Sequence, residues 1–161
     1  MSARVIRARG LVAGQAQGPA LVSPDPISFL GDVAITSGEI VALMPIGSLF
    51  FAGASEFEED LPEVGDARRD VVIIRLRDRD EVGSTFIRAI ERYTQQLQTQ
   101  DNKLMLEGLN ERVLEQLEET ALLDLIGEEN VFLAQPRFGV AAGQAMAAAE
   151  AWIAEPDENA D

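Results

Sequence analysis

The residues best placed to carry chemistry lie in one stretch of the chain, from Asp70 to Ile90. Four consecutive β-branched apolar residues at 71–74 predict a strand buried on both faces. An acidic loop at 78–81 follows, and apolar residues then recur at helical spacing. Ser84 and Thr85 fall where that helix begins, so a hydroxyl there either caps the helix or exposes a switch beside a strand end.

The acidic loop offers a second candidate chemistry. Asp78, Asp80 and Glu81 carry the carboxylate oxygens that Mg²⁺ and Ca²⁺ prefer. A run of carboxylates is more typical of a solvated loop, and we therefore predict that the chain binds no metal.

A glycine-flanked segment is the third candidate. Gly47, Ser48 and Gly53 surround two phenylalanines, which is compatible with a loop that a nucleotide or an anion approaches. The alternative is a turn whose phenylalanines belong to the core. We keep Gly47, Ser48 and Gly53 as a candidate ligand loop.

Composition excludes several classes of function. Among 161 residues there are 28 acidic and 13 basic side chains, a formal net charge of -15, which disfavours binding to nucleic acid and to anionic lipid. The chain has no Cys and no His, so disulfides, thiolate nucleophiles, imidazole catalysis and the usual zinc sites are absent. No window is apolar enough for direct membrane insertion, and no secretory signal is visible. We expect a cytoplasmic protein without a cofactor.

The chain divides near residue 40. Residues 1–40 are rich in Gly, Pro and Ser with short apolar runs, which predict β-strands. Residues 41–154 alternate strand and helix patterns, and residues 155–161 form an acidic tail expected to be disordered. Ser55 and Glu58 have capping-box spacing for a helix near residue 55. The predicted fold is α/β, a mixed sheet with helices packed on it and extended by N-terminal strands.

The first segment carries a resemblance. Gly14-x-Ala16-x-Gly18-x-Ala20-Leu21-Val22-Ser23 followed by Pro26-Ile27-Ser28-Phe29-x-Gly31-Asp32-Val33 resembles the start of the swivelling β/β/α domain of aconitase-X-type dehydratases. In that family the domain closes over an active site that the large subunit provides. The family's continuation after this stretch is absent from the present sequence.

The second segment resembles another family. Gly47-Ser48-Leu49-Phe50-Phe51-Ala52, the strand from Asp70 leading to Ser84-Thr85, and Lys103-Leu104-Met105-Leu106-x-Gly108 are similar to the STAS domain of SulP-type anion transporters. This resemblance implies a domain that regulates and positions a transporter and can self-associate. Related anti-anti-sigma proteins carry Asp-Ser-(Ser/Thr)-Gly at the helix start, where the Ser accepts a phosphate. Ser84 matches that phosphoacceptor, although Gly83 and Phe86 replace the motif's Asp and Gly.

We therefore predict a non-enzymatic STAS-like regulatory or interaction domain, a natural or engineered chimera with a swivelling-domain fragment. The expected partner is a second copy or another protein, and the parent of the STAS-like part is expected to be a membrane transporter. The alternative is an accessory swivelling subunit of an aconitase-X-type dehydratase. The helix from about Phe138 to Ala154, which is rich in alanine, could pack on its own sheet or on a second copy.

Overall fold

The computed structural model describes residues 4–9, 37–45, 49–50 and 52–155. Within these described ranges, five strands and five α-helices follow one another, with one 3-10 turn before the last strand. The strands are β1 (Arg4–Arg9), β2 (Glu39–Met44), β3 (Val71–Arg75), β4 (Lys103–Leu109) and β5 (Val131–Leu133). The helices are α1 (Ala52–Glu59), α2 (Ser84–Thr99), α3 (Glu111–Glu118), α4 (Leu122–Ile126) and α5 (Val140–Ala154), with η1 at Glu128–Asn130.

The strands form one sheet in the order in which they occur along the chain, β1-β2-β3-β4-β5. β1 pairs antiparallel with β2 along six residues, from Arg4 opposite Met44 to Arg9 opposite Glu39. The pairs β2–β3, β3–β4 and β4–β5 are all parallel. The predicted mixed α/β sheet is therefore confirmed, and the N-terminal segment supplies its antiparallel edge strand.

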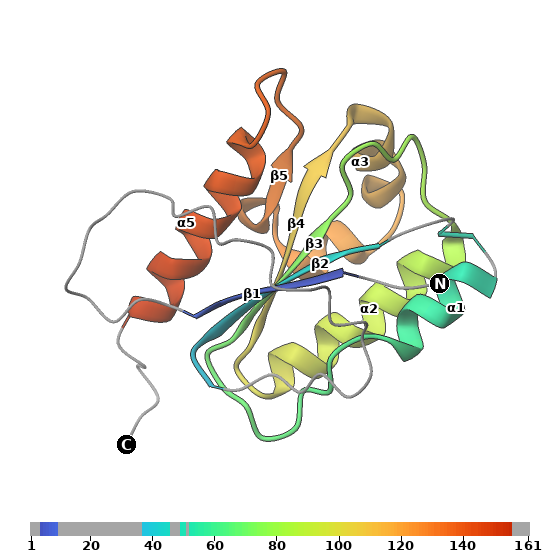
Figure 1. Ribbon diagram of the computed structural model, residues 1–161. Coiled ribbons are helices and arrows are strands. Elements are labelled where there is room, and N and C mark those ends of the chain that lie inside the picture. The colour runs from blue at the N-terminus through green and yellow to red at the C-terminus, as the bar shows by residue number, and fades with distance from the viewer. Residues whose placement is uncertain (1–3, 10–36, 46–48, 51, 156–161) are drawn as a thin grey trace.

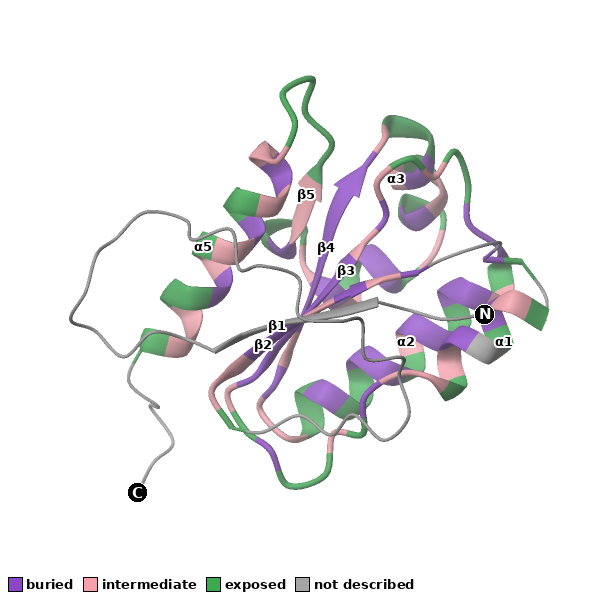
Figure 2. Cartoon of the chain, viewed as in Figure 1, coloured by how far each residue is buried: buried purple, intermediate pink, exposed green. Residues whose placement is uncertain are grey.

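Helices cover both faces of the sheet (Figure 1). On one face, α1, α2, α3 and α4 enclose the larger core, which includes Leu43, Ile74, Leu106, Phe86 and Leu97. On the other face, α5 packs its Ala145 and Ala149 over a smaller apolar cluster that contains Ile73 and Met105. The four residues of the predicted strand at 71–74 are all buried, as expected for a strand covered on both sides (Figure 2).

Helix starts are where the sequence prediction fails. The N-cap of α2 is Gly83, whose extended backbone precedes the helix, and Ser84 is the first helical residue. No side chain caps this helix, so the prediction of Ser84 or Thr85 as its cap was wrong. Ser55 lies inside α1, which begins at Ala52, so the capping box with Glu58 was wrong as well. α3 does have the expected type of cap, because Asn110 Oδ1 accepts from the Val113 N–H at 2.8 Å.

Candidate functional site

The ends of the parallel strands place several loops together at what we call the carboxyl edge. It comprises Pro45, Leu49 and Phe50 after β2, residues 76–83 after β3, Asn110 after β4 and residues 134–139 after β5. In Figure 1 this edge lies where the β4 arrow points, beside α3 and the β5–α5 loop. Ligand sites of parallel α/β sheets form at this end of the strands, so the candidate site is sought here.

Hydrogen bonds hold the loop between β3 and α2 from three sides. The guanidinium of Arg79 donates to the Pro45 carbonyl at 2.6 Å, and the Asn110 amide donates to the Arg79 carbonyl at 2.9 Å. The Gln116 side chain pairs with both backbone groups of Val82, at 3.0 and 3.2 Å. Burial lowers the pKa of Arg79 from its ordinary value. The loop is thus a fixed part of the edge.

Gly83 is held tightly where this loop enters α2. Its N–H donates to the Leu49 carbonyl at 3.3 Å, and a Cβ at this position would lie 2.9 Å from that oxygen and 3.0 Å from Phe50 Cδ1. The absence of a side chain therefore lets the loops after β2 and β3 touch. Sequence analysis identified Gly83 only as a departure from the phosphoacceptor motif.

Ser84 is exposed at the first turn of α2. Since it makes no capping bond, its hydroxyl is not committed to the helix start. The exposed position is compatible with the role of phosphoacceptor that the sequence resemblance implies, which stays a prediction.

The predicted ligand loop is described only at its end. Gly53 lies in α1, and its N–H donates to the Phe50 carbonyl at 3.1 Å, so its backbone helps to begin that helix. Gly47 and Ser48 lie outside the described residues. Phe50, expected in the core by the alternative interpretation, is 36% exposed.

The acidic loop presents its carboxylates to solvent. Asp78, Asp80 and Glu81 are exposed, and Glu81 lies 3.7 Å from the guanidinium of Arg112. In the described part of the chain, no three His, Cys, Asp or Glu side chains are grouped so that they could hold a metal ion.

An aromatic side chain supported by two arginines marks the other end of the carboxyl edge. Phe138 is 76% exposed, and its ring centroid lies 4.8 Å from the guanidinium of Arg77 and 5.7 Å from that of Arg75. Residues 133–138 are all exposed, including Leu133 on the preceding strand (Figure 2). We call Phe138 and the two arginines that contact its ring, Arg75 and Arg77, the Phe138 surface. Sequence analysis missed it, because Phe138 was expected to open the last helix.

The Phe138 surface rests on an ion pair inside the sheet. Arg75 and Glu107 are direct cross-strand partners on β3 and β4, and Arg75 Nε lies 3.2 Å from Glu107 Oε1. Burial raises the pKa of Glu107, while the charges of Arg75 and Arg77 oppose that rise. This buried carboxylate therefore holds Arg75, one of the two arginines that contact the Phe138 ring.

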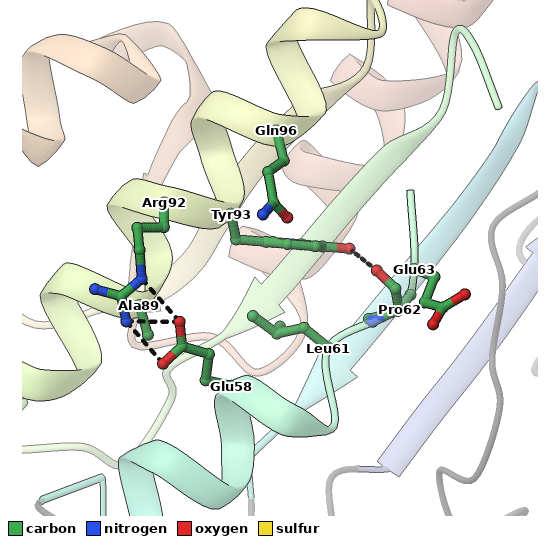
Figure 3. A pocket seen from close by; sticks show the side chains of 8 residues that line it. All are labelled: Glu58, Leu61, Pro62, Glu63, Ala89, Arg92, Tyr93 and Gln96. Atoms are coloured by element: carbon green, nitrogen blue, oxygen red, sulfur yellow. Dashed lines mark hydrogen bonds and ion pairs between the residues drawn. The ribbon is translucent and has the colours of Figure 1, made fainter. Parts of the chain in front are cut away.

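A separate hollow of about 210 Å³ lies between α1 and α2 (Figure 3). The Glu58 carboxylate at its rim accepts three hydrogen bonds from Arg92, and the Tyr93 hydroxyl donates to the Pro62 carbonyl at 2.9 Å. These polar groups are thus already paired with one another. Neither Gly53 nor Ser84 lines this hollow.

The fold is that of an α/β domain with a mixed sheet, whose four parallel strands carry loops at their carboxyl ends. The family model for the STAS domain matches residues 33–135, and the chain therefore belongs to the STAS domain family. The model for the aconitase X swivel domain matches residues 5–46, which include β2 and all of β1 except its first residue. A search of curated proteins found no match.

Solved structures of transporter domains share the fold. A sulfate transporter family protein from Wolinella succinogenes is similar with a TM-score of 0.59 and 21% identity, over 71% of this chain and 87% of that chain. The SulP transporter STAS domain from Vibrio cholerae has a TM-score of 0.51 and 24% identity, over 70% of this chain and 81% of that one. The murine anion transporter Slc26a9 has a TM-score of 0.54 and 13% identity, over 70% of this chain and 18% of that one.

Within the described ranges, every helix is too short or too polar to span a bilayer.

Proposed function

We propose that this chain is a non-enzymatic regulatory and interaction domain of an anion transporter, working on the cytoplasmic side through contact with the membrane part of that transporter. Family membership supports the proposal, as do neighbours that are named as sulfate or anion transporters. The domain's own carboxyl edge would supply the contact.

The observation that carries the proposal is the Phe138 surface. A large aromatic side chain that is 76% exposed and supported by arginine is typical of residues that dominate protein interfaces. The guanidinium of Arg77 restricts the conformations of the Phe138 side chain before binding. Less side-chain conformational entropy is therefore lost when a partner binds.

The test is anion transport by a chimeric transporter. A sulfate-transporter-family protein is reconstituted in vesicles with its STAS region intact, deleted, or replaced by residues 1–161. We expect the replacement to restore uptake that the deletion reduces, and Phe138→Ala to lower the restored rate. Uptake equal to that of the deletion would contradict the proposal, and a stable dimer of the isolated chain through the Phe138 surface would reassign the contact to a second copy.

For the chain's organisation we propose a natural or engineered chimera. Residues 1–40 would derive from a swivelling domain, residues 41–154 would form the STAS-like part, and 155–161 a disordered tail. The two family matches support this, because they overlap only over residues 33–46. In this arrangement β1 would extend the sheet of the STAS-like part through its pairing with β2.

The aconitase X match favours a second candidate, an accessory swivelling subunit of a dehydratase. Its test is dehydratase activity after the purified chain is added to a large catalytic subunit that lacks its own swivelling partner. Our proposal predicts no activity above that of the large subunit alone, and a gain would favour the dehydratase.

A further inference from the structure

At the opposite edge of the sheet, where the parallel strands begin, a carboxyl group is completely buried. Asp70 immediately precedes β3 and its exposed fraction is 0%. Its Oδ1 accepts from the backbone N–H of Glu39, the first residue of β2, at 2.7 Å. Its Oδ2 has no hydrogen-bond partner and is shielded from solvent. The side chain therefore joins the starts of two strands while one of its oxygens stays unsatisfied.

Asn102 fixes Asp70 from the side of β4. Asn102 Oδ1 accepts from the Asp70 backbone N–H at 3.0 Å, and its amide donates to the Ala67 carbonyl at 2.7 Å. The Lys103 N–H donates to the Asp70 carbonyl at 2.9 Å. The oxygen and the nitrogen of the Asn102 side chain are thus both hydrogen-bonded. The backbone of Asp70 is bonded to Asn102 and to Lys103 at the start of β4. The carboxyl group of Asp70 is bonded to the first residue of β2.

Among the side chains that the structure describes, no charged group around this carboxyl neutralises it. Glu39 on β2 is the charged residue that acts on it, and its negative charge opposes ionisation of Asp70. On α2, the phenol of Tyr93 is buried, and burial together with the charge of Asp70 raises its pKa, so it remains neutral. The cationic groups of Arg69 and Lys103 lie over the Trp152 ring of α5, 4.1 and 4.8 Å from its centroid. Arg68 is exposed, and among the described cations none forms an ion pair with Asp70.

Burial is the largest influence on this group and raises the pKa of Asp70 from 3.8 to about 6, against the opposing effect of the Glu39 and Gly38 N–H groups. Among the side chains that the structure describes, no cation pairs with the Oδ2 of a carboxylate that forms here. The carboxylate can recover hydration only if the junction between residues 37–40 and β3 opens.

We propose that Asp70 is a proton-operated latch, which keeps the start of β2 closed on β3 when protonated and favours local opening of this junction when ionised. The junction is the point where the N-terminal segment joins the parallel strands. Its opening would loosen the attachment of that segment without unfolding the helices. The latch thus goes beyond the proposed interaction at the carboxyl edge.

The direction of the effect follows from proton linkage. The closed form holds the Asp70 proton with a pKa of about 6, whereas the open, hydrated form returns to about 3.8. Between these values the closed form binds more protons, so opening becomes more favourable as pH rises. The equilibrium constant for opening should increase about tenfold per pH unit in this window, about 100-fold in total, and should level off above the higher value.

Hydrogen exchange of the full chain between pH 4 and 8, corrected for intrinsic rates, tests the latch. We expect the protection of the Gly38 and Glu39 amides to fall about 100-fold between pH 4 and 6 and then to stay level. In Asp70→Asn the pH dependence should disappear, whereas Asp124→Asn, at an exposed position on α4, should retain it. A flat profile in the natural sequence, retention of the profile in Asp70→Asn, or an equal fall at every protected amide of the molecule would overturn the proposal.

A direct titration keeps the proposal testable if Asp70→Asn does not fold. The carboxyl carbon of Asp70 is followed by NMR in the unsubstituted chain. A midpoint near 6 supports the latch, and a midpoint near that of an ordinary exposed aspartate contradicts it.

Discussion

Arg75 and Glu107 lie directly opposite each other on β3 and β4, and Arg75 Nε is 3.2 Å from Glu107 Oε1. The carboxylate side chain is 5% exposed and the arginine 25%, so this pair is sheltered from water far more than the pair between Arg92 and Glu58. Because the same arginine contacts the Phe138 ring, the pair joins the sheet interior to the proposed interaction surface.

Glu107→Ala should lower the free energy of unfolding by about 2–3 kcal/mol, since it leaves a half-buried arginine on β3 without its partner. Glu58→Ala removes an exposed carboxylate from Arg92 and should cost less than about 1 kcal/mol. Urea denaturation of both variants provides the comparison. Equal losses would mean that the position of the Arg75 pair within the sheet has no energetic consequence.

Gly83→Ala should destabilise the chain by about 1–3 kcal/mol, because the added Cβ would meet the Leu49 carbonyl at 2.9 Å and force the two loops apart. Gly143 offers the matched control on α5, where no atom lies within 4 Å of an added Cβ. Gly143→Ala should stabilise the chain by about 0.5–1 kcal/mol through helix propensity. Thermal unfolding tests both, and a neutral Gly83→Ala would contradict the close contact.

Ser84→Ala should change the free energy of unfolding by less than about 0.5 kcal/mol, since the exposed hydroxyl does not cap α2. The comparison variant is Asn110→Ala, which removes the N-cap bond to Val113 as well as the bond to the Arg79 carbonyl and should cost about 1–2 kcal/mol. If Ser84→Ala were as costly as Asn110→Ala, Ser84 would cap α2, which is the role that the sequence first indicated for it.

Deleting residues 1–9 should lower the free energy of unfolding by at least about 2 kcal/mol, because β2 would lose its antiparallel neighbour along six residue pairs. Ile40, Val41 and Leu43 on β2 are almost completely buried, so the loss would reach the core. Chemical denaturation of the shortened chain measures it. Unchanged stability would mean that β1 is an appendage to a sheet that is complete without it.

Much of the fold could be predicted from the sequence, because periodicity and burial agree over long segments. The buried strand at 71–74 and the amphipathic helix α2 lie where apolar spacing placed them. Helix starts were less predictable, since Gly83 caps α2 through its backbone conformation alone, a role that no side-chain pattern reveals.

The candidate sites depended on contacts between residues distant in the sequence. The pairing of Arg75 with Glu107 follows from the β3–β4 register, and the exposure of Phe138 follows from a loop that delays α5 until Val140. Asp70 precedes four β-branched residues, a pattern that indicates a strand start but not that the carboxyl would be enclosed by residues from β2 and β4.

The most direct test of the interaction domain is its affinity for the membrane part of a sulfate-transporter-family protein from the same organism, measured with the purified full chain. We predict saturable binding that Phe138→Ala weakens at least about tenfold, which corresponds to about 1.4 kcal/mol. Gln144→Ala, at an exposed position on α5, should bind as the natural chain does. Equal affinities of the natural chain and Phe138→Ala, or no binding by either, would contradict the account.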